Sequence, residues 1–156
     1  KTGSGFTVSG TDGTDTLTGI ERLQFADKSI ALDINGTAGQ AYRLYQAAFD
    51  RTPDVGGLSY WIHSMDNGMT LKQVATGFIG SAEFQSLYGA RPTDMQYVNL
   101  LYNNVLNRSA DKGGYDYWVG QMNGGMTREQ VLIGFSESGE NQASLIGVIQ
   151  DGITYI

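Results

Sequence analysis

An arginine, an aspartate and a pair of glycines recur with one spacing at two places in the chain, and these residue types are suited to binding an ion. We name each copy the Arg-Asp-Gly-Gly loop. The residues concerned are Arg51, Asp54, Gly56 and Gly57 in the first copy and Arg108, Asp111, Gly113 and Gly114 in the second. Carboxylates in a glycine-rich loop suit calcium, but a helix-loop-helix calcium loop starting at Asp50 would end on a glutamate, and Trp61 stands there. We therefore expect both aspartates to cap the next helix, and both arginines to pair locally or to cover the preceding helix end.

Each loop runs into a Tyr-Trp pair, which has the chemistry of a sugar-stacking surface. Trp61 and Trp118 lie on the apolar stripe of their helix, so we expect them to pack in the core. Tyr60 and Tyr117 lie about 100° round the helix from those tryptophans. These two tyrosines are the candidate ligand-binding residues, with packing at the core boundary as the alternative.

Catalytic chemistry has little support in the residue types. His63 is the single histidine, and Gly120 stands at its place in the second copy, so a Ser-His-Asp triad would depend on one unrepeated residue. The absence of cysteine excludes thiolate nucleophiles and cysteine-based zinc sites. We expect a protein that is not an enzyme, with no catalytic residues to assign.

The two loops belong to a tandem duplication. Shifting residues 51–81 by 57 positions onto residues 108–138 matches 15 of 31 residues identically, which indicates a repeat. Apolar residues at helical spacing, Thr-x-x-Gln capping boxes at Thr70 and Thr127, and N-cap serines at Ser81 and Ser138 predict four helices in each copy. The units are expected over about residues 40–89 and 95–149.

The fold class is therefore mainly α, with two homologous helical units packed as a bundle and a small β-hairpin before them. Residues 1–35 have a composition and an apolar pattern typical of strands and turns, and residues 36–156 are expected to form the helical repeat domain. Leu23 and Phe25 alternate with polar residues before a turn, and Ile30 and Leu32 repeat that period after it, which predicts the hairpin. The apolar tail, residues 146–156, is expected either to pack as a final helix or to form part of an export signal.

Residues 40–145 resemble a bacterial domain-of-unknown-function family built from tandem helical units with the pattern Leu-Tyr, Arg-x-x-Asp-x-Gly-Gly-x-x-Tyr-Trp. Here that pattern runs from Leu44-Tyr45 to Trp61 and from Leu101-Tyr102 to Trp118. Residues 10–17 resemble one hemolysin-type calcium-binding nonapeptide repeat, with Thr11 in place of a glycine. The resemblance implies the C-terminal part of a protein exported by type I secretion. It also implies calcium as a cofactor, with Asp12 and Asp15 as its ligands.

Charge and composition limit the partners. The net charge is −6 and no run of Lys or Arg occurs, so nucleic acid is not an expected partner. No apolar run is long enough to span a bilayer. We expect an extracellular or cell-surface bacterial module that serves export, folding outside the cell and attachment to a cell-surface or extracellular matrix component, with polysaccharide as one candidate component. The alternatives are a glycan-binding module and part of a secreted hydrolase.

Overall fold

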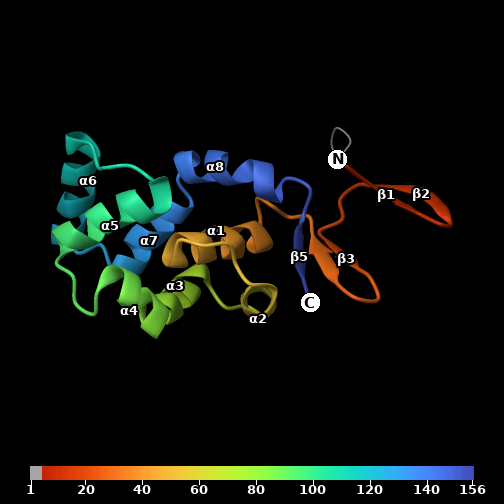
Figure 1. Cartoon of the computed structure of the whole chain (residues 1–156), viewed down its shortest axis with the longest axis horizontal. Coiled ribbons are helices and arrows are strands. Elements are labelled where there is room, and N and C mark those ends of the chain that lie inside the picture. Colours follow the sequence, from red (N-terminus) through yellow and green to blue (C-terminus); the bar gives the residue numbers. More distant parts are fainter. Residues whose placement is uncertain (1–4) are drawn as a thin grey trace.

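The computed structural model describes residues 5–156, which form a helical body with a β portion at one end (Figure 1). In chain order the elements are β1 (Phe6–Gly10), β2 (Gly13–Leu17), β3 (Arg22–Gln24), β4 (Ser29–Ala31), α1 (Thr37–Phe49), α2 (Val55–Asp66), α3 (Leu71–Ile79), α4 (Ala82–Tyr88), α5 (Asp94–Leu106), α6 (Lys112–Asn123), α7 (Arg128–Ser136), α8 (Gly139–Ile149) and β5 (Ile153–Tyr155). The mainly α fold with a preceding hairpin is confirmed.

The duplication holds at the level of helix boundaries. Adding 57 to the bounds of α1, α2 and α3 gives the bounds of α5, α6 and α7 residue for residue. The fourth pair differs, because the shifted α4 would end at residue 145 and α8 continues to Ile149. The two units therefore share one helical plan and differ where each unit ends.

Local capping explains where these helices begin. Thr70 and Gln73, Thr93 and Gln96, and Thr127 and Gln130 each form a reciprocal capping box. Ser81 and Ser138 cap α4 and α8 with their side-chain oxygens. The predicted caps are confirmed, and Thr93 rather than Asp94 caps the first helix of the second unit.

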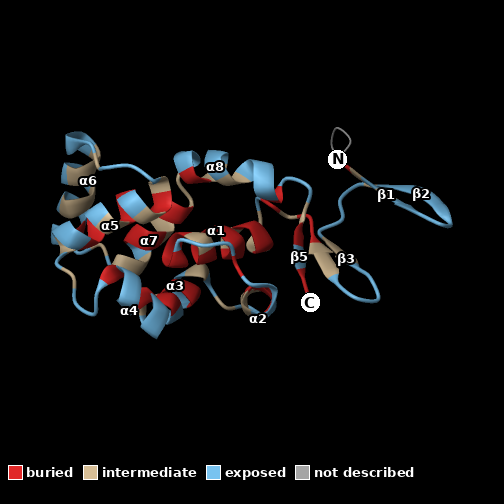
Figure 2. Cartoon of the chain, viewed as in Figure 1, coloured by how far each residue is buried: buried red, intermediate tan, exposed pale blue. Residues whose placement is uncertain are grey.

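Helix α1 lies at the centre of the helical body, and both units pack around it. It contacts α2, α3 and α4 of its own unit and α5, α7 and α8 of the other. Figure 2 shows α1 buried along nearly its whole length. Burial on α1 is not confined to one face, because Ala38, Tyr42, Arg43 and Ala47 are all buried. Small alanines let neighbouring helices approach α1 on every side, so the two units share one hydrophobic core.

A partly buried ion pair joins the units across this core. Arg43 of α1 is 3% exposed and donates to both carboxylate oxygens of Glu137, at 2.8 and 2.6 Å. Its Nη1 also donates to the backbone oxygen of Ile34 at 2.7 Å. The pair is outside the repeat, because Leu100 and Gly80 occupy the positions that correspond to Arg43 and Glu137.

The predicted hairpin forms between β3 and β4, with Leu23 opposite Ile30. A third strand, β5, pairs antiparallel with β4, so the end of the chain completes this sheet. The expectation of a helical tail was wrong beyond α8, because residues 153–155 form a strand. Ile153 and Tyr155 of this strand are buried in a second hydrophobic cluster with residues of α1 and α2. The β portion is thus attached to the helical body through its last strand.

Strands β1 and β2 form a second hairpin that extends away from the helical body (Figure 1). Most of its residues are exposed, as Figure 2 shows. The sequence pattern had indicated a repeat turn over residues 10–17, and the structure has an antiparallel pair with Gly10 opposite Gly13.

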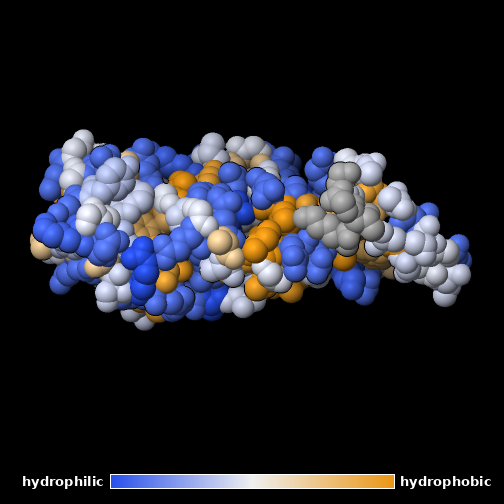
Figure 3. All heavy atoms as spheres, turned by 90° about the horizontal axis from the view of Figure 1, so that it is seen from above, coloured by the Kyte–Doolittle hydropathy of each residue, from blue (hydrophilic) through white to orange (hydrophobic). Residues whose placement is uncertain are grey.

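The surface is largely hydrophilic. Seen from above in Figure 3, hydrophobic atoms gather near the middle of the molecule, on the face where α8 lies. Exposed apolar side chains that α8 contributes are Ile146 and Val148. Within residues 5–156 no helix has the length and apolar character that crossing a membrane requires.

Candidate functional site

The aspartates of the two Arg-Asp-Gly-Gly loops cap helices, as predicted. Asp54 accepts a hydrogen bond from the Gly57 backbone N–H at 2.7 Å, and Asp111 accepts one from Gly114 at 2.9 Å. Hydrogen bonds from the Tyr45 hydroxyl and from the Gly57 amide lower the pKa of Asp54. The Gly114 amide lowers the pKa of Asp111. Both carboxylates are thus held ionised at the positive end of a helix.

The arginines of these loops form ion pairs with a distant glutamate as well as with the local aspartate. Arg51 Nε donates to Glu83 Oε1 at 2.6 Å, and Arg108 Nε donates to Glu140 Oε1 at 2.7 Å, in each case to a glutamate 32 residues away. The nearby aspartates are farther, at 3.5 Å from Arg51 and 3.4 Å from Arg108. Each arginine therefore joins the loop to the first turn of the fourth helix of its unit.

A tyrosine of the first helix lies beside each arginine. The guanidinium carbon of Arg51 is 5.1 Å from the ring centre of Tyr45, and that of Arg108 is 4.9 Å from Tyr102. In the first unit the Tyr45 hydroxyl donates to Asp54 Oδ2 at 2.6 Å and accepts from Arg51 Nη2 at 3.0 Å. Tyrosine, aspartate, arginine and glutamate thus connect the first, second and fourth helices.

The two glycines of each loop have different roles. A Cβ on Gly57 would lie 3.0 Å from the Tyr45 hydroxyl oxygen, and one on Gly114 would overlap the hydroxyl oxygen of Tyr102. The first glycines, Gly56 and Gly113, have more room, since their nearest neighbours would be 3.8 and 3.5 Å away. The second glycine of each loop therefore has less room than the first: a Cβ on Gly114 would collide with the tyrosine, and one on Gly57 would be in tight contact with both the tyrosine hydroxyl and the Asp54 carboxylate.

The tryptophans pack against the core, which confirms the expectation for them. Trp61 lies edge-on to Phe78 with ring centres 4.9 Å apart, and Trp118 lies 5.0 Å from Phe135. Both tryptophans are partly buried, and both pack against the main hydrophobic cluster.

Tyr60 and Tyr117 are 60% and 55% exposed, so both rings are open to solvent. Each is supported edge-to-face by the tryptophan that follows it, at 4.9 and 5.1 Å between ring centres. Helices α2 and α6, which carry them, lie in different parts of the helical body (Figure 1). The structure therefore presents two separate tyrosine surfaces rather than one site.

Asp12 and Asp15 are both exposed on the outer hairpin. Asp12 lies in the turn between β1 and β2, and Asp15 lies on β2 opposite Val8. In the part of the chain that the structure describes, no group of three or more His, Asp or Glu side chains is placed to hold a metal ion. A calcium site on these two residues would need further oxygen ligands from elsewhere.

His63 lies at the surface beside the C-terminal strand. Its ring centre is 5.4 Å from that of Tyr155, and its Nε2 is 3.2 Å from the backbone oxygen of Ile156. The histidine is exposed, and the contacts described for it are with residues 155 and 156.

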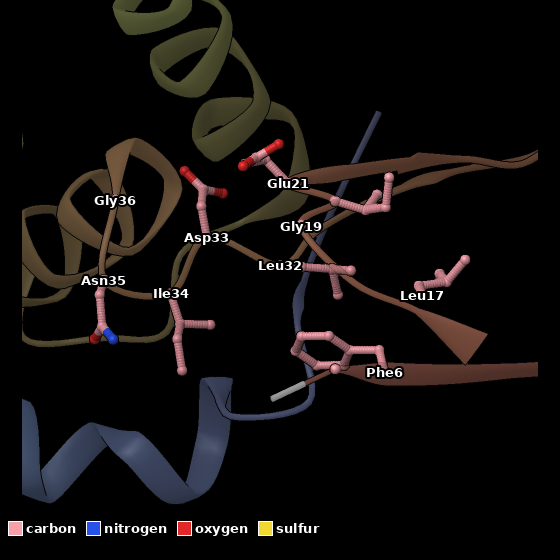
Figure 4. A pocket seen from close by; sticks show the side chains of 11 residues that line it. Phe6, Leu17, Gly19, Glu21, Leu32, Asp33, Ile34, Asn35 and Gly36 are labelled. Atoms are coloured by element: carbon pink, nitrogen blue, oxygen red, sulfur yellow. The ribbon is translucent and has the colours of Figure 1, made fainter. Parts of the chain in front are cut away.

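A pocket of about 340 Å³ lies between the outer hairpin and the start of α1 (Figure 4). Phe6 and Leu17 line one side, and Glu21 and Asp33 lie near each other on the other. Asp33 is already engaged, because Arg22 donates to its Oδ1 and the Ala38 backbone N–H donates to its Oδ2 at 3.1 Å. Asp33 therefore anchors the beginning of α1.

Sequence reasoning missed Glu83 and Glu140 as partners of the arginines, because it expected those arginines to pair locally or to cover the preceding helix end. A signal was present, because each glutamate follows its arginine at one spacing in both copies. The pair of Arg43 and Glu137 had no such signal, since it occurs once and joins residues 94 apart.

Comparison with known proteins gives one family. A search of curated proteins found no match, and a search of solved structures found none either. A family model described as a domain of unknown function (DUF4214) matches twice, over residues 39–86 and 75–145, which together cover more than half of the chain. The first match spans α1 to α4, and the second begins within α3 and runs through the second unit into α8, so the chain belongs to the DUF4214 family.

Proposed function

We propose that this chain is a non-catalytic module of a secreted, calcium-associated bacterial surface protein. In this proposal it forms the C-terminal part of that protein and serves type I export, folding outside the cell and attachment to a cell-surface or extracellular matrix component. The observation that carries the proposal is that the repeated polar residues are engaged in hydrogen bonds and ion pairs within the chain. In both Arg-Asp-Gly-Gly loops they bond to other residues of the same unit.

Such an arrangement favours a scaffold over an active site. A catalytic acid or base must be free to exchange a proton with a substrate, and its pKa is usually tuned toward neutral pH. Asp54 and Asp111 have lowered pKa values and are bound to backbone amides of their own helix. Their chemistry is that of helix caps.

The calcium part of the proposal predicts a metal-dependent gain in stability. Extracellular modules bind calcium with dissociation constants of about 0.1–1 mM, so about 10 mM calcium should raise the melting temperature of the chain. The double variant Asp12→Ala, Asp15→Ala should lose that rise. Thermal melts with calcium, with magnesium and with chelator measure it.

The matched control is Asp27→Ala, Asp151→Ala, which removes the same charge from two other exposed turn positions. The control should keep the calcium response. An equal response in both double variants, or no response in the unchanged chain, would remove calcium from the proposal for residues 5–156.

A second candidate function, glycan binding, is favoured by the exposed rings of Tyr60 and Tyr117. Each ring is backed by a tryptophan, which limits its motion, and aromatic rings of this kind stack on sugar faces. Changing both tyrosines to alanine should weaken any glycan binding at least about tenfold while shifting the melting temperature little, because the rings are exposed.

A glycan array on the unchanged chain, followed by titration with each positive glycan, measures this binding. Met95→Ala is the matched control, because Met95 is 56% exposed and carries no ring. Glycan binding that survives in the double tyrosine variant would show that these tyrosines are not the contact.

A further inference from the structure

A second pocket, of about 560 Å³, lies where the two helical units join. Its volume is in the range of small-molecule sites. The lining comes from the end of α4, the linker after it and the beginning of α5, and includes Gly89, Arg91, Pro92, Gln96, Asn99 and Leu100. None of these residues belongs to an Arg-Asp-Gly-Gly loop.

The pocket arises where the duplication breaks. Helix α4 ends at Tyr88, and Gly89 then takes a φ of 84°, a left-handed conformation that favours glycine. At the corresponding place in the second unit stands Ile146, within α8. The first unit therefore has an open turn where the second has continuous helix.

Arg91 is the one arginine of residues 5–156 that makes no ion pair. The chain has five others, Arg22, Arg43, Arg51, Arg108 and Arg128, and each pairs with a carboxylate. Arg91 also makes no hydrogen bond to another described residue, and a guanidinium offers a planar set of N–H donors that matches a carboxylate. A free guanidinium on a pocket wall, in a chain of net charge −6, is suited to a carboxylate ligand.

Two carboxamides extend this polar wall. Gln96 uses its Oε1 to accept from the Thr93 backbone N–H at 2.9 Å, which leaves its amide nitrogen to donate elsewhere. Asn99 is exposed, and its side chain makes no hydrogen bond within the described chain. Carboxamides donate to and accept from alcohols, while Pro92 and Leu100 offer apolar contact to C–H groups.

We propose that this junction pocket binds a sugar that carries a carboxylate, of the uronic acid class. Arg91 pairs with the carboxylate, Gln96 and Asn99 bond to ring hydroxyls, and Pro92 and Leu100 contact the ring. The site is separate from the tyrosine surfaces of α2 and α6, and it does not depend on calcium or on the attachment function.

The test is an NMR titration of the ¹⁵N-labelled chain with sodium galacturonate, with galactose and with sodium acetate as separate arms. Galacturonate should shift the amides of residues 89–100 with a dissociation constant of about 1–10 mM. Galactose lacks the carboxylate and acetate lacks the hydroxyls, so each should bind at least about tenfold more weakly.

The variant Arg91→Gln removes the charge from an exposed residue, and it should weaken galacturonate binding at least about tenfold. Lys28→Gln removes a charge from another exposed position that makes no ion pair, and it should leave binding unchanged. The proposal is overturned by any of three results: no shifts at residues 89–100 up to about 20 mM ligand, equal binding of acetate and galacturonate, or unchanged binding in Arg91→Gln.

Discussion

Replacing Gly39 with alanine is expected to destabilise the chain by more than about 3 kcal/mol. A Cβ on Gly39 would overlap the backbone oxygen of Ile34 and would lie 2.9 Å from Arg43 Nη1. Neither neighbour can move freely, because Arg43 is buried and is bonded to that same backbone oxygen. The steric cost therefore outweighs the gain of about 1 kcal/mol that alanine brings to a helix interior.

The matched control for this prediction is Gly147→Ala. Gly147 also lies within a helix, and an added Cβ there would meet no atom within 4 Å. This change should raise stability by about 0.5–1 kcal/mol. Urea unfolding followed by circular dichroism gives both values. A Gly39→Ala chain as stable as the unchanged one would mean that residues 33–36 do not pack on α1 as described.

Removing the charge of Glu137 is expected to cost about 3 kcal/mol, the second large effect. Glu137→Gln would leave the Arg43 guanidinium buried without its counter-charge, with a neutral amide as its partner. Because the pair joins the units and because Arg43 also holds Ile34, the loss should weaken the whole core rather than one helix end. At this chain length the melting temperature should fall by roughly 6–12 °C.

Two further variants separate the buried charge from other causes. Arg43→Met combined with Glu137→Leu removes both charges and should recover most of the lost stability, since apolar pairs often replace buried ion pairs without loss. Glu83→Gln breaks an exposed pair and should cost between zero and about 1 kcal/mol. If Glu137→Gln costs no more than Glu83→Gln, the buried pair does not hold the units together.

The helical plan could be predicted from the sequence because its determinants are local. Caps such as Thr70 with Gln73 lie three residues apart. The duplication doubles every such signal, which is why even the boundaries repeat. The helix α1 was harder to predict, because buried alanines such as Ala38 and Ala47 are weak hydrophobic signals and periodicity shows only the strongest face.

The parts that could not be predicted depend on contacts between distant residues. Arg51 with Glu83, and Arg43 with Glu137, become neighbours only after the helices pack. Strand β5 has three residues, too few for a periodic pattern, and its partner β4 is more than 100 residues earlier in the chain. For Asp12 and Asp15 a short motif indicated calcium. The structure places them on an exposed hairpin, and within residues 5–156 no group of three or more acidic or histidine side chains is placed to hold a metal ion.

The most direct test of the central claim, that the repeated loops serve structure, compares alanine at the four loop glycines. Gly57→Ala and Gly114→Ala should each lower the melting temperature, because the new Cβ would press on Tyr45 or Tyr102. Gly56→Ala and Gly113→Ala should leave it unchanged or raise it, because those positions have room and lie in a helix. Equal melting temperatures for all four variants would contradict the claim, and would mean that the second glycines are not there to admit a tyrosine.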